Sequence, residues 1–143
     1  MSRAVGSHVA VSGLASSATL RRARRAVLGV LDSEDVEADV AITFVGKQRM
    51  RRLNAEYLGR DRSTDVIAFA LPQPGGALAG DVYICPYAAA RQARAHDVTL
   101  PEELLRLVVH GTLHVLGWDH PEGASRMASA MWRRQERYVA ALA

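Results

Sequence analysis

The sequence lacks the features that mark small secreted proteins and membrane proteins. Its 143 residues include one cysteine, Cys85, which excludes an internal disulfide framework and a zinc cage built from several cysteines. No apolar run approaches the roughly 20 residues of a transmembrane helix. Near the N-terminus, Ser7, His8, Ser12 and Gly13 interrupt the apolar segment that a signal peptide would need. We therefore expect a cytoplasmic protein with no membrane partner.

Internal repeats are also lacking, as is any change of composition that would mark a domain boundary. Hydrophobic residues make up 49% of the chain and charged residues 23%, which excludes a long disordered protein. A chain of this length can bury most of its apolar surface without disulfides or oligomerisation. We expect one domain over residues 1–143.

Positive charge exceeds negative charge, giving a net charge of +3, and the basic residues are clustered. The clusters are Arg21, Arg22, Arg24 and Arg25; Lys47, Arg49, Arg51 and Arg52; and Arg133, Arg134 and Arg137. Such clusters fit a polyanionic partner such as nucleic acid. Arginines also cover ordinary solvated helix faces, so the charge by itself leaves both interpretations open.

Hydrophobic periodicity predicts strands in the first half of the chain and mainly helices in the second half. The expected strands cover residues 9–11, 38–45, 66–71 and 81–85. The expected helices cover residues 18–31, 47–57, 86–95, 101–116 and 122–142. This order indicates an α+β fold in which a small mixed four-stranded sheet packs with about five helices.

Local signals refine these elements. The polar residues 32–35 predict a connector, and residues 72–76 predict a flexible loop. The continuous apolar run at 66–71 is typical of a strand buried on both faces. Thr99, with Glu102 three residues later, is a capping-box pattern for the start of a helix.

The segment HGTLHVLGWDH contains three of the five histidines of the chain. His110 and His114 are four residues apart on an expected helix, so both imidazoles lie on one face and can reach the same ion. Gly117 allows the chain to leave the helix in a left-handed conformation, and a short turn then brings His120 back to the same point. The sequence therefore predicts a metal cleft at the end of a helix.

The composition of this segment favours a catalytic zinc ion. A closed structural zinc site normally has a fourth protein ligand, whereas three neutral histidines leave one position open. Nickel, copper and iron also accept imidazole ligands. At such a centre the ion polarises the electrophile and activates water near neutral pH, which is hydrolytic chemistry. The competing interpretation is that single histidines on an apolar face are ordinary core residues.

The spacing H-x3-H-x2-G-x2-H also matches the zinc-binding segment of metzincin peptidases. Those enzymes have a glutamate directly after the first histidine as general base, and this chain has Gly111 there. A zinc peptidase is therefore the weaker hypothesis. Asp119, next to His120, is a candidate general base, or it orients a histidine from behind.

From about Asp39 onward the chain resembles the YbeY endoribonucleases, metal-dependent RNA hydrolases of bacteria and organelles. The resemblance rests on four blocks in order: Leu53-Asn54 followed by Tyr57, STDVIAF at 63–69, GDVYI at 80–84 and HGTLHVLGWDH at 110–120. It implies an α+β fold and a zinc ion held by His110, His114 and His120. It also implies single-strand-specific cleavage in the maturation of the 16S ribosomal RNA 3′ end, ribosome quality control, and the small ribosomal subunit as partner.

The chain departs from the family pattern at three positions. The family usually has an arginine, important for activity, directly after the tyrosine, and Leu58 stands there. Arg60 is the candidate to take over as the phosphate-binding residue, Arg62 is the alternative, and both also fit solvated loop positions. Ser63 replaces a usual proline and Ala68 a usual serine; both changes look tolerated.

The remaining polar positions have simpler interpretations. Thr64 and Asp65 precede one expected strand and Asp81 precedes the next, where turn capping explains them. His8 and His96 fit exposed surface positions and are not proposed as ligands.

Two classes of function follow. The first is a zinc-dependent, single-strand-specific endoribonuclease with metal ligands His110, His114 and His120 and with Arg60 and Asp119 as catalytic candidates. The second is an RNA- or ribosome-binding assembly factor whose metal is mainly structural, a hypothesis that Leu58 at the arginine position motivates.

Overall fold

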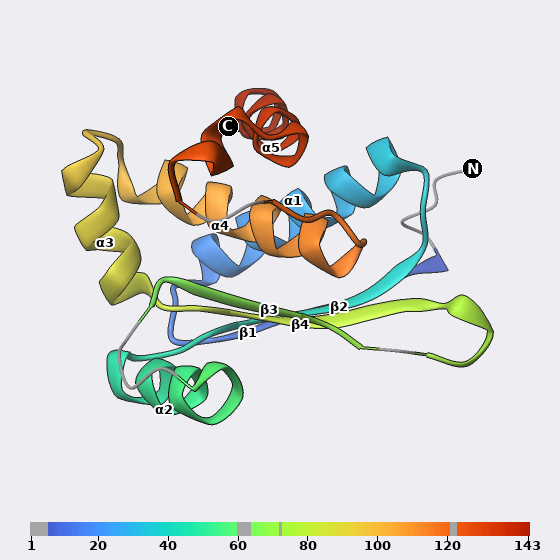
Figure 1. Ribbon diagram of the computed structural model, residues 1–143, viewed down its shortest axis with the longest axis horizontal. Helices are drawn as coiled ribbons and strands as arrows, with labels where there is room; N and C mark the ends of the chain where they lie inside the picture. Colours follow the sequence, from blue (N-terminus) through green and yellow to red (C-terminus); the bar gives the residue numbers. More distant parts are fainter. Residues whose placement is uncertain (1–5, 60–63, 72, 121–122) are drawn as a thin grey trace.

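In the computed structural model of the protein, which describes residues 6–59, 64–71, 73–120 and 123–143, four strands form one mixed sheet (Figure 1). The strands are β1 (His8–Gly13), β2 (Ala38–Phe44), β3 (Val66–Ala70) and β4 (Leu78–Ile84), in the spatial order β1-β2-β4-β3. β1, β2 and β4 are mutually parallel, and β3 runs antiparallel to β4. The expected small mixed four-stranded sheet is confirmed.

Five α-helices surround this sheet in the described part of the chain. They are α1 (Ser17–Glu34), α2 (Lys47–Leu58), α3 (Pro86–Ala95), α4 (Leu100–Val115) and α5 (Ala130–Leu142). α1 and α4 cover one face of the sheet, α5 packs on the outside of α4, and α2 lies alone on the opposite face (Figure 1). None of the described helices combines the length and the apolar character needed to cross a bilayer.

Two glycines bring α4 unusually close to the sheet. A Cβ atom added to Gly111 of α4 would lie 2.4 Å from Val82 Cγ1 on β4. A Cβ atom added to Gly80 of β4 would lie 2.6 Å from Val115 Cγ2 on α4. Because neither position has room for a side chain, the helix is held against the centre of the sheet along its second half.

β3 is an edge strand, and the prediction that residues 66–71 are buried on both faces holds only in part. Ile67 is 3% exposed, but Val66, Ala68 and Phe69 are only half-buried and Ala70 is exposed. The strand nevertheless has apolar contacts on both faces: Val66 and Ala68 pack against the main core, and Ile67 and Phe69 pack on the α2 side. The Phe69 ring also lies edge-on to Tyr57 and Tyr83, with centroids 5.1 and 6.4 Å away.

α1 continues through most of the segment that was predicted as a polar connector. Residues 32–34 are helical, and only Asp35, with φ of 55°, leaves the helix in the left-handed conformation. Glu34 explains the extension, because its carboxylate accepts hydrogen bonds from Trp118 Nε1 at 3.0 Å and from Arg134 at 2.7 Å. The polar residues therefore anchor the helix end rather than interrupt it.

The C-terminal helix is shorter than the predicted range of 122–142, of which Glu122 lies outside the described residues. A 3-10 helix, η3 (Gly123–Ala128), comes first, and α5 begins only after Ser129, whose hydroxyl accepts a hydrogen bond from the Trp132 amide at 3.1 Å. The serine caps a new helix start and so separates the two elements. The predicted loop at 72–76 contains a short 3-10 turn, η2 (Pro74–Gly76), and Pro72 lies outside the described residues.

Candidate metal centre

The start and end of α4 are both set by local sequence. The Thr99 hydroxyl accepts a hydrogen bond from the Glu102 amide at 3.2 Å, which is the expected N-cap. The Glu102 carboxylate pairs with Arg106 instead of returning to Thr99, so one half of the predicted capping box forms. At the other end, Gly117 has φ of 99°, which confirms its predicted left-handed conformation and turns the chain back toward α4.

This turn brings together the three histidines predicted as metal ligands. The ring centroids of His110 and His114 lie 4.6 Å apart, and that of His120 lies 5.0 Å from each of them. One potential ligand atom from each side chain lies within 4.8 Å of the other two. Within the described ranges these are the only grouped side chains of this kind, and we call them the histidine triad.

The surroundings keep two histidines of the triad, His110 and His114, in the form that a metal ion needs. Burial, helped by the neighbouring imidazoles, lowers the pKa of His110 to about 4 although its hydrogen bond to Gln135 acts in the opposite direction. Burial and the adjacent His120 likewise lower the pKa of His114. Both side chains are therefore neutral at pH 7 and have a lone pair available for coordination.

Gln135 of α5 fixes the orientation of the first ligand. His110 Nδ1–H donates a hydrogen bond of 2.7 Å to Gln135 Oε1, which leaves Nε2 unprotonated for an ion. The Gln135 side chain is only 1% exposed, and its amide nitrogen donates to Glu136 Oε2 at 3.0 Å. Because both ends of the amide are occupied, its orientation and the tautomer of His110 are determined together.

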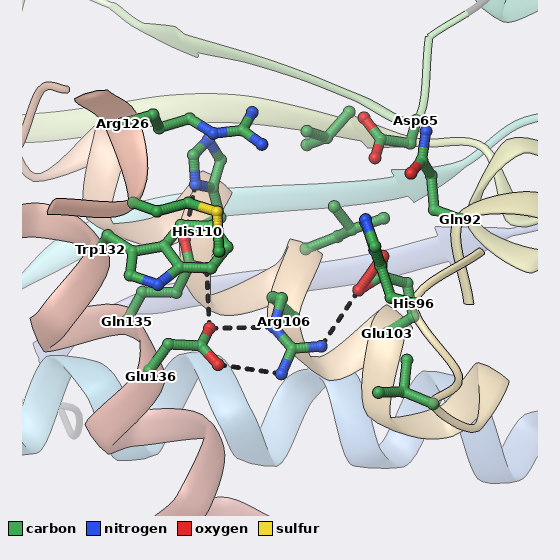
Figure 2. A pocket seen from close by; sticks show the side chains of 14 residues that line it. Asp65, Gln92, His96, Glu103, Arg106, His110, Arg126, Trp132, Gln135 and Glu136 are labelled. Atoms are coloured by element: carbon green, nitrogen blue, oxygen red, sulfur yellow. Dashed lines mark hydrogen bonds and ion pairs between the residues drawn. The ribbon is translucent and has the colours of Figure 1, made fainter. Parts of the chain in front are cut away.

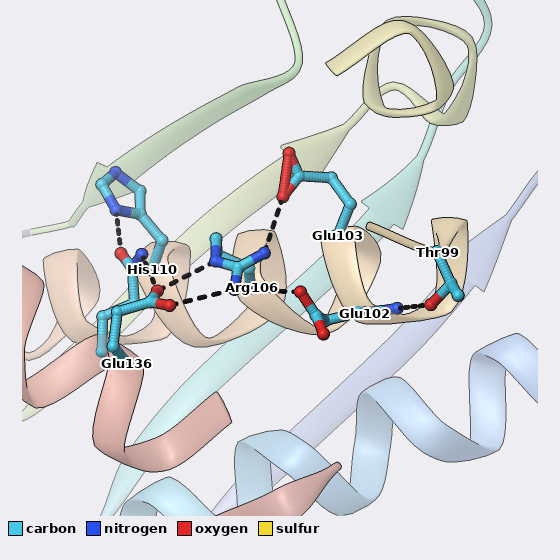
Figure 3. Close-up of polar contacts among 7 residues, drawn as sticks. Thr99, Glu102, Glu103, Arg106, His110 and Glu136 are labelled. Carbon is cyan, nitrogen blue, oxygen red and sulfur yellow. Dashed lines mark hydrogen bonds and ion pairs between the residues drawn. The ribbon is translucent and has the colours of Figure 1, made fainter. Parts of the chain in front are cut away.

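Arg106 extends this network along α4 (Figure 3). It donates two hydrogen bonds of 2.9 Å to the two oxygens of Glu136, one of 3.1 Å to Glu103 and one of 3.2 Å to Glu102. The hydrogen bond to Glu136 raises the pKa of Arg106 by more than burial lowers it. α5, through Gln135 and Glu136, is thereby tied to the same helix that carries two of the three histidines.

The donor set fits a metal ion that prefers nitrogen ligands, as zinc does. Cys85 does not contribute, because it is fully buried with Val45, Met50 and Ile67 on the α2 side of the sheet. Gly111 packs against Val82, so the position of the metzincin glutamate faces the sheet and has no room for a side chain. The site is thus a three-histidine group without the peptidase base.

Of the two catalytic candidates, the structure describes Asp119 but not Arg60. Asp119 is exposed, and its carboxylate accepts a hydrogen bond from the His120 amide at 2.9 Å, which places it directly beside the triad. Arg60, together with the alternative Arg62, lies outside the described residues. Leu58 is the last residue of α2 and is 47% exposed.

The secondary polar positions differ in part from expectation. Asp65 directly precedes β3 as predicted, and burial raises the pKa of its carboxyl group. Asp81 lies inside β4, opposite Phe69, rather than ahead of the strand, because β4 begins at Leu78. His8 is in β1 and His96 follows α3; both are exposed, as predicted.

A cavity of about 430 Å³, which we call the triad cavity, opens beside the first ligand. His110, Arg126 and Trp132 line one end, and Asp65, Gln92 and His96 line the other (Figure 2). The Arg126 guanidinium lies over the Trp132 ring, 5.6 Å from its centroid. The space next to the triad is therefore bordered by a cation and an aromatic ring.

Comparison with known proteins decides the family. A sequence model of the family described as endoribonuclease YbeY matches residues 11–143. The chain belongs to the YbeY endoribonuclease family. The resemblance found in the sequence is thus confirmed, and the family name carries the expected enzyme class.

Curated YbeY proteins of several bacteria are similar to this chain. The endoribonuclease YbeY of Anaeromyxobacter sp. (strain Fw109-5) is 42% identical over 120 residues, which is 81% of this chain and 62% of the relative. That of Syntrophotalea carbinolica is 36% identical over 129 residues, 85% of this chain and 83% of the relative. The chain therefore spans less than two thirds of the Anaeromyxobacter protein and most of the Syntrophotalea protein.

A solution structure of a Thermotoga maritima protein has the same fold. It superimposes with a TM-score of 0.69 at 28% identity and covers 94% of this chain and 88% of the other. The YbeY endoribonuclease of Thermotoga maritima is 33% identical to this chain over 110 residues. The α+β fold predicted from the sequence is confirmed by this likeness as well as by the strand order.

Sequence reasoning missed the residues that support this YbeY site from outside the histidine motif. Gln135, Glu136 and Arg126 lie beyond the motif, and nothing local links them to His110. One signal was present: Gln135 falls in the apolar stripe of α5, between the buried residues Met131 and Val139. A polar side chain in such a stripe needs a buried partner.

Proposed function

We propose that the protein is a metal-dependent endoribonuclease that hydrolyses single-stranded RNA. The observation that carries the proposal is the convergence of His110, His114 and His120 at one point, in a chain whose relatives are named endoribonucleases. The triad supplies three imidazole nitrogen donors and has no fourth histidine, cysteine or carboxylate grouped with it among the described residues. That arrangement favours a catalytic over a closed structural site.

The ion we propose is Zn²⁺, one per chain, held by His110, His114 and His120. When bound, it supplies Lewis-acid chemistry, polarising a phosphoryl oxygen and activating water for attack. Gln135 keeps Nε2 of His110 free for the ion by accepting a hydrogen bond from Nδ1–H through its amide oxygen.

Asp119 and Arg60 have the proposed catalytic roles. Asp119 accepts the proton of the attacking water as general base or holds the His120 segment in place, and its hydrogen bond to the His120 amide supports the second role directly. Arg60 binds the phosphate in place of the arginine that the family usually has at Leu58, with Arg62 as the alternative.

The proposed substrate is ribosomal RNA of the small subunit, with action in maturation of the 16S RNA 3′ end and in ribosome quality control. These roles come with the family, and the net charge of +3 is compatible with an RNA partner. We place the protein in the cytoplasm, where a single free thiol such as Cys85 remains reduced.

The experiment that tests this function compares His114→Ala with His8→Ala. His114 belongs to the triad, whereas His8 lies exposed in β1 and serves as the control. We expect His114→Ala to lose bound zinc and cleavage of a single-stranded RNA oligonucleotide, and His8→Ala to retain both. Undiminished cleavage by a zinc-free His114→Ala protein would rule out the metal mechanism.

Leu58 favours a second function, an RNA- or ribosome-binding assembly factor whose metal is mainly structural. In that case a folded His114→Ala protein would rescue a strain with defective ribosomal RNA processing as well as the wild type does. If the protein is an endoribonuclease, the same variant is expected to fail in this complementation test although it is present at normal levels.

A further inference from the structure

A second cavity adjoins the triad cavity. It has a volume of about 500 Å³ and lies between α2 and α3, with residues from both ends of α2 in its lining. Asp65, Val66 and Gln92 line both cavities. In Figure 2, Asp65 and Gln92 mark the end of the triad cavity that is farther from His110. A ligand strand that leaves the triad along its cavity therefore reaches the second cavity next.

The second cavity carries positive charge and an exposed aromatic ring. Lys47 and Arg91 line it, and both are exposed. Tyr87 lines it as well; its side chain is 51% exposed, and the Lys47 ammonium lies 4.9 Å from its ring centroid. We call it the basic cavity.

These are the groups with which proteins hold single-stranded nucleic acid. Lysine and arginine neutralise phosphates, and an exposed aromatic ring stacks on a base without regard to its identity. Asp65 is the acidic residue that lines both cavities, and the guanidinium of Arg126 points toward it from the far end of the triad cavity (Figure 2). The two other carboxylates of the triad cavity, Glu103 and Glu136, are both paired with Arg106.

We propose that the basic cavity is a binding subsite for RNA nucleotides that flank the scissile phosphate, with Lys47 and Arg91 contacting phosphate groups and Tyr87 stacking on a base. This inference rests on the proposed endoribonuclease function and extends it. The triad cavity holds the reacting nucleotide, and the basic cavity sets how long a strand must be for tight binding.

The test uses RNA length as the variable. Binding of oligouridylates of about 4 and about 12 nucleotides is measured by fluorescence anisotropy with chelator present, so that the RNA stays intact. The variant is Lys47→Gln with Arg91→Gln, and the control is Arg21→Gln with Arg25→Gln, which removes the same charge from exposed positions on α1.

We expect the Lys47→Gln/Arg91→Gln protein to bind the longer RNA about 10-fold or more weakly and the shorter RNA nearly as well as the wild type. The slope of log affinity against log salt for the longer RNA should become shallower by about 1.4, since each lost phosphate contact on single strands accounts for about 0.7. The α1 control should show a smaller loss that does not depend on length. Tyr87→Leu should also weaken only the longer RNA.

Equal losses in the variant and the control, or equal losses for both RNA lengths, would overturn the subsite. Cleavage by the wild-type protein is measured in parallel with zinc present. If the wild type cleaves RNA and Lys47→Gln/Arg91→Gln binds normally, this inference fails and the proposed function stands. If the variant shows the length-dependent loss and the wild type never cleaves, the subsite stands and the proposed function fails.

Discussion

Gly111 determines both the packing of α4 and the chemistry of the site. Its missing side chain lets the helix approach Val82 of β4, and the same absence removes the glutamate that a metzincin would have after its first histidine. The backbone of α4 next to His110 is therefore held against the centre of the sheet. We expect any side chain at this position to push the helix, and with it two ligands, away from β4.

Gly111→Ala tests this packing. An alanine Cβ would lie 2.4 Å from Val82 Cγ1, so the substitution should lower the free energy of unfolding by about 1–3 kcal/mol and weaken zinc binding. Gly29→Ala is the matched control, because Gly29 also lies inside a helix but an added Cβ atom would meet only the end of the Leu142 side chain, at 3.0 Å. Urea denaturation should find the control unchanged or more stable by up to about 1 kcal/mol. A Gly111→Ala protein as stable as the wild type would contradict the close packing.

Gln135 is expected to influence metal binding through its hydrogen bond to His110. Gln135→Leu keeps the volume of the side chain but removes the acceptor of the Nδ1 proton. We expect zinc affinity to fall about 10- to 100-fold, measured by competition with a coloured chelator. The NMR signal of the hydrogen-bonded Nδ1 proton of His110, expected in the wild-type spectrum, should be missing from the spectrum of Gln135→Leu.

Gln48→Leu, at an exposed position of α2, provides the control and should leave zinc affinity unchanged. Thermal unfolding of the metal-free proteins shows whether Gln135→Leu loses zinc affinity because His110 is no longer oriented or because the whole fold is less stable. Wild-type zinc affinity in a folded Gln135→Leu protein would show that the hydrogen bond does not prepare the site.

At the level of elements, Glu34 joins the end of α1 to α5 and to the turn that leads to His120. Its side chain is 9% exposed and accepts hydrogen bonds from Tyr138, Trp118 and Arg134. Burial alone would raise the pKa of Glu34, but these three partners outweigh burial and hold the pKa below its ordinary value. The ionised carboxylate is therefore the form that stabilises the fold.

The sign of the pH dependence follows from this lowered pKa. The contribution of Glu34 is fully present above its unfolded pKa, near 4.5, and is lost as the pH falls through the lower folded value. Glu34→Gln should reduce the free energy of unfolding at about pH 7 by about 1–3 kcal/mol. The difference from the wild type should shrink below pH 4.5. Glu37→Gln, at an exposed position, is the control in urea denaturation at both pH values, and a constant difference for Glu34→Gln would contradict the ionised role.

For the whole molecule, the features that depend on local spacing could be predicted from the sequence. The i, i+4 histidines and the glycine turn bring His120 back because helix geometry and the left-handed conformation fix these positions within a few residues. The Thr99 cap follows in the same way from a short-range signal, and the order of strand and helix patterns along the chain indicates a mixed sheet without giving its strand order.

Features that depend on contacts between distant segments could not be predicted. The hydrogen bond between His110 and Gln135 spans 25 residues, and the one between Trp118 and Glu34 spans 84. The edge position of β3 depends on strand order, which an apolar run does not encode. Each of these features depends on contacts that exist only in the packed fold.

Titration of metal-free protein with zinc tests most directly whether the histidine triad holds a catalytic zinc ion. Bound zinc and the rate of cleavage of a single-stranded ribosomal RNA fragment are measured on the same samples. Cleavage should be absent without zinc, rise in proportion to bound zinc and level off at about one ion per chain. Cleavage at full rate in the metal-free protein, or full zinc binding without any gain in cleavage, would contradict the claim.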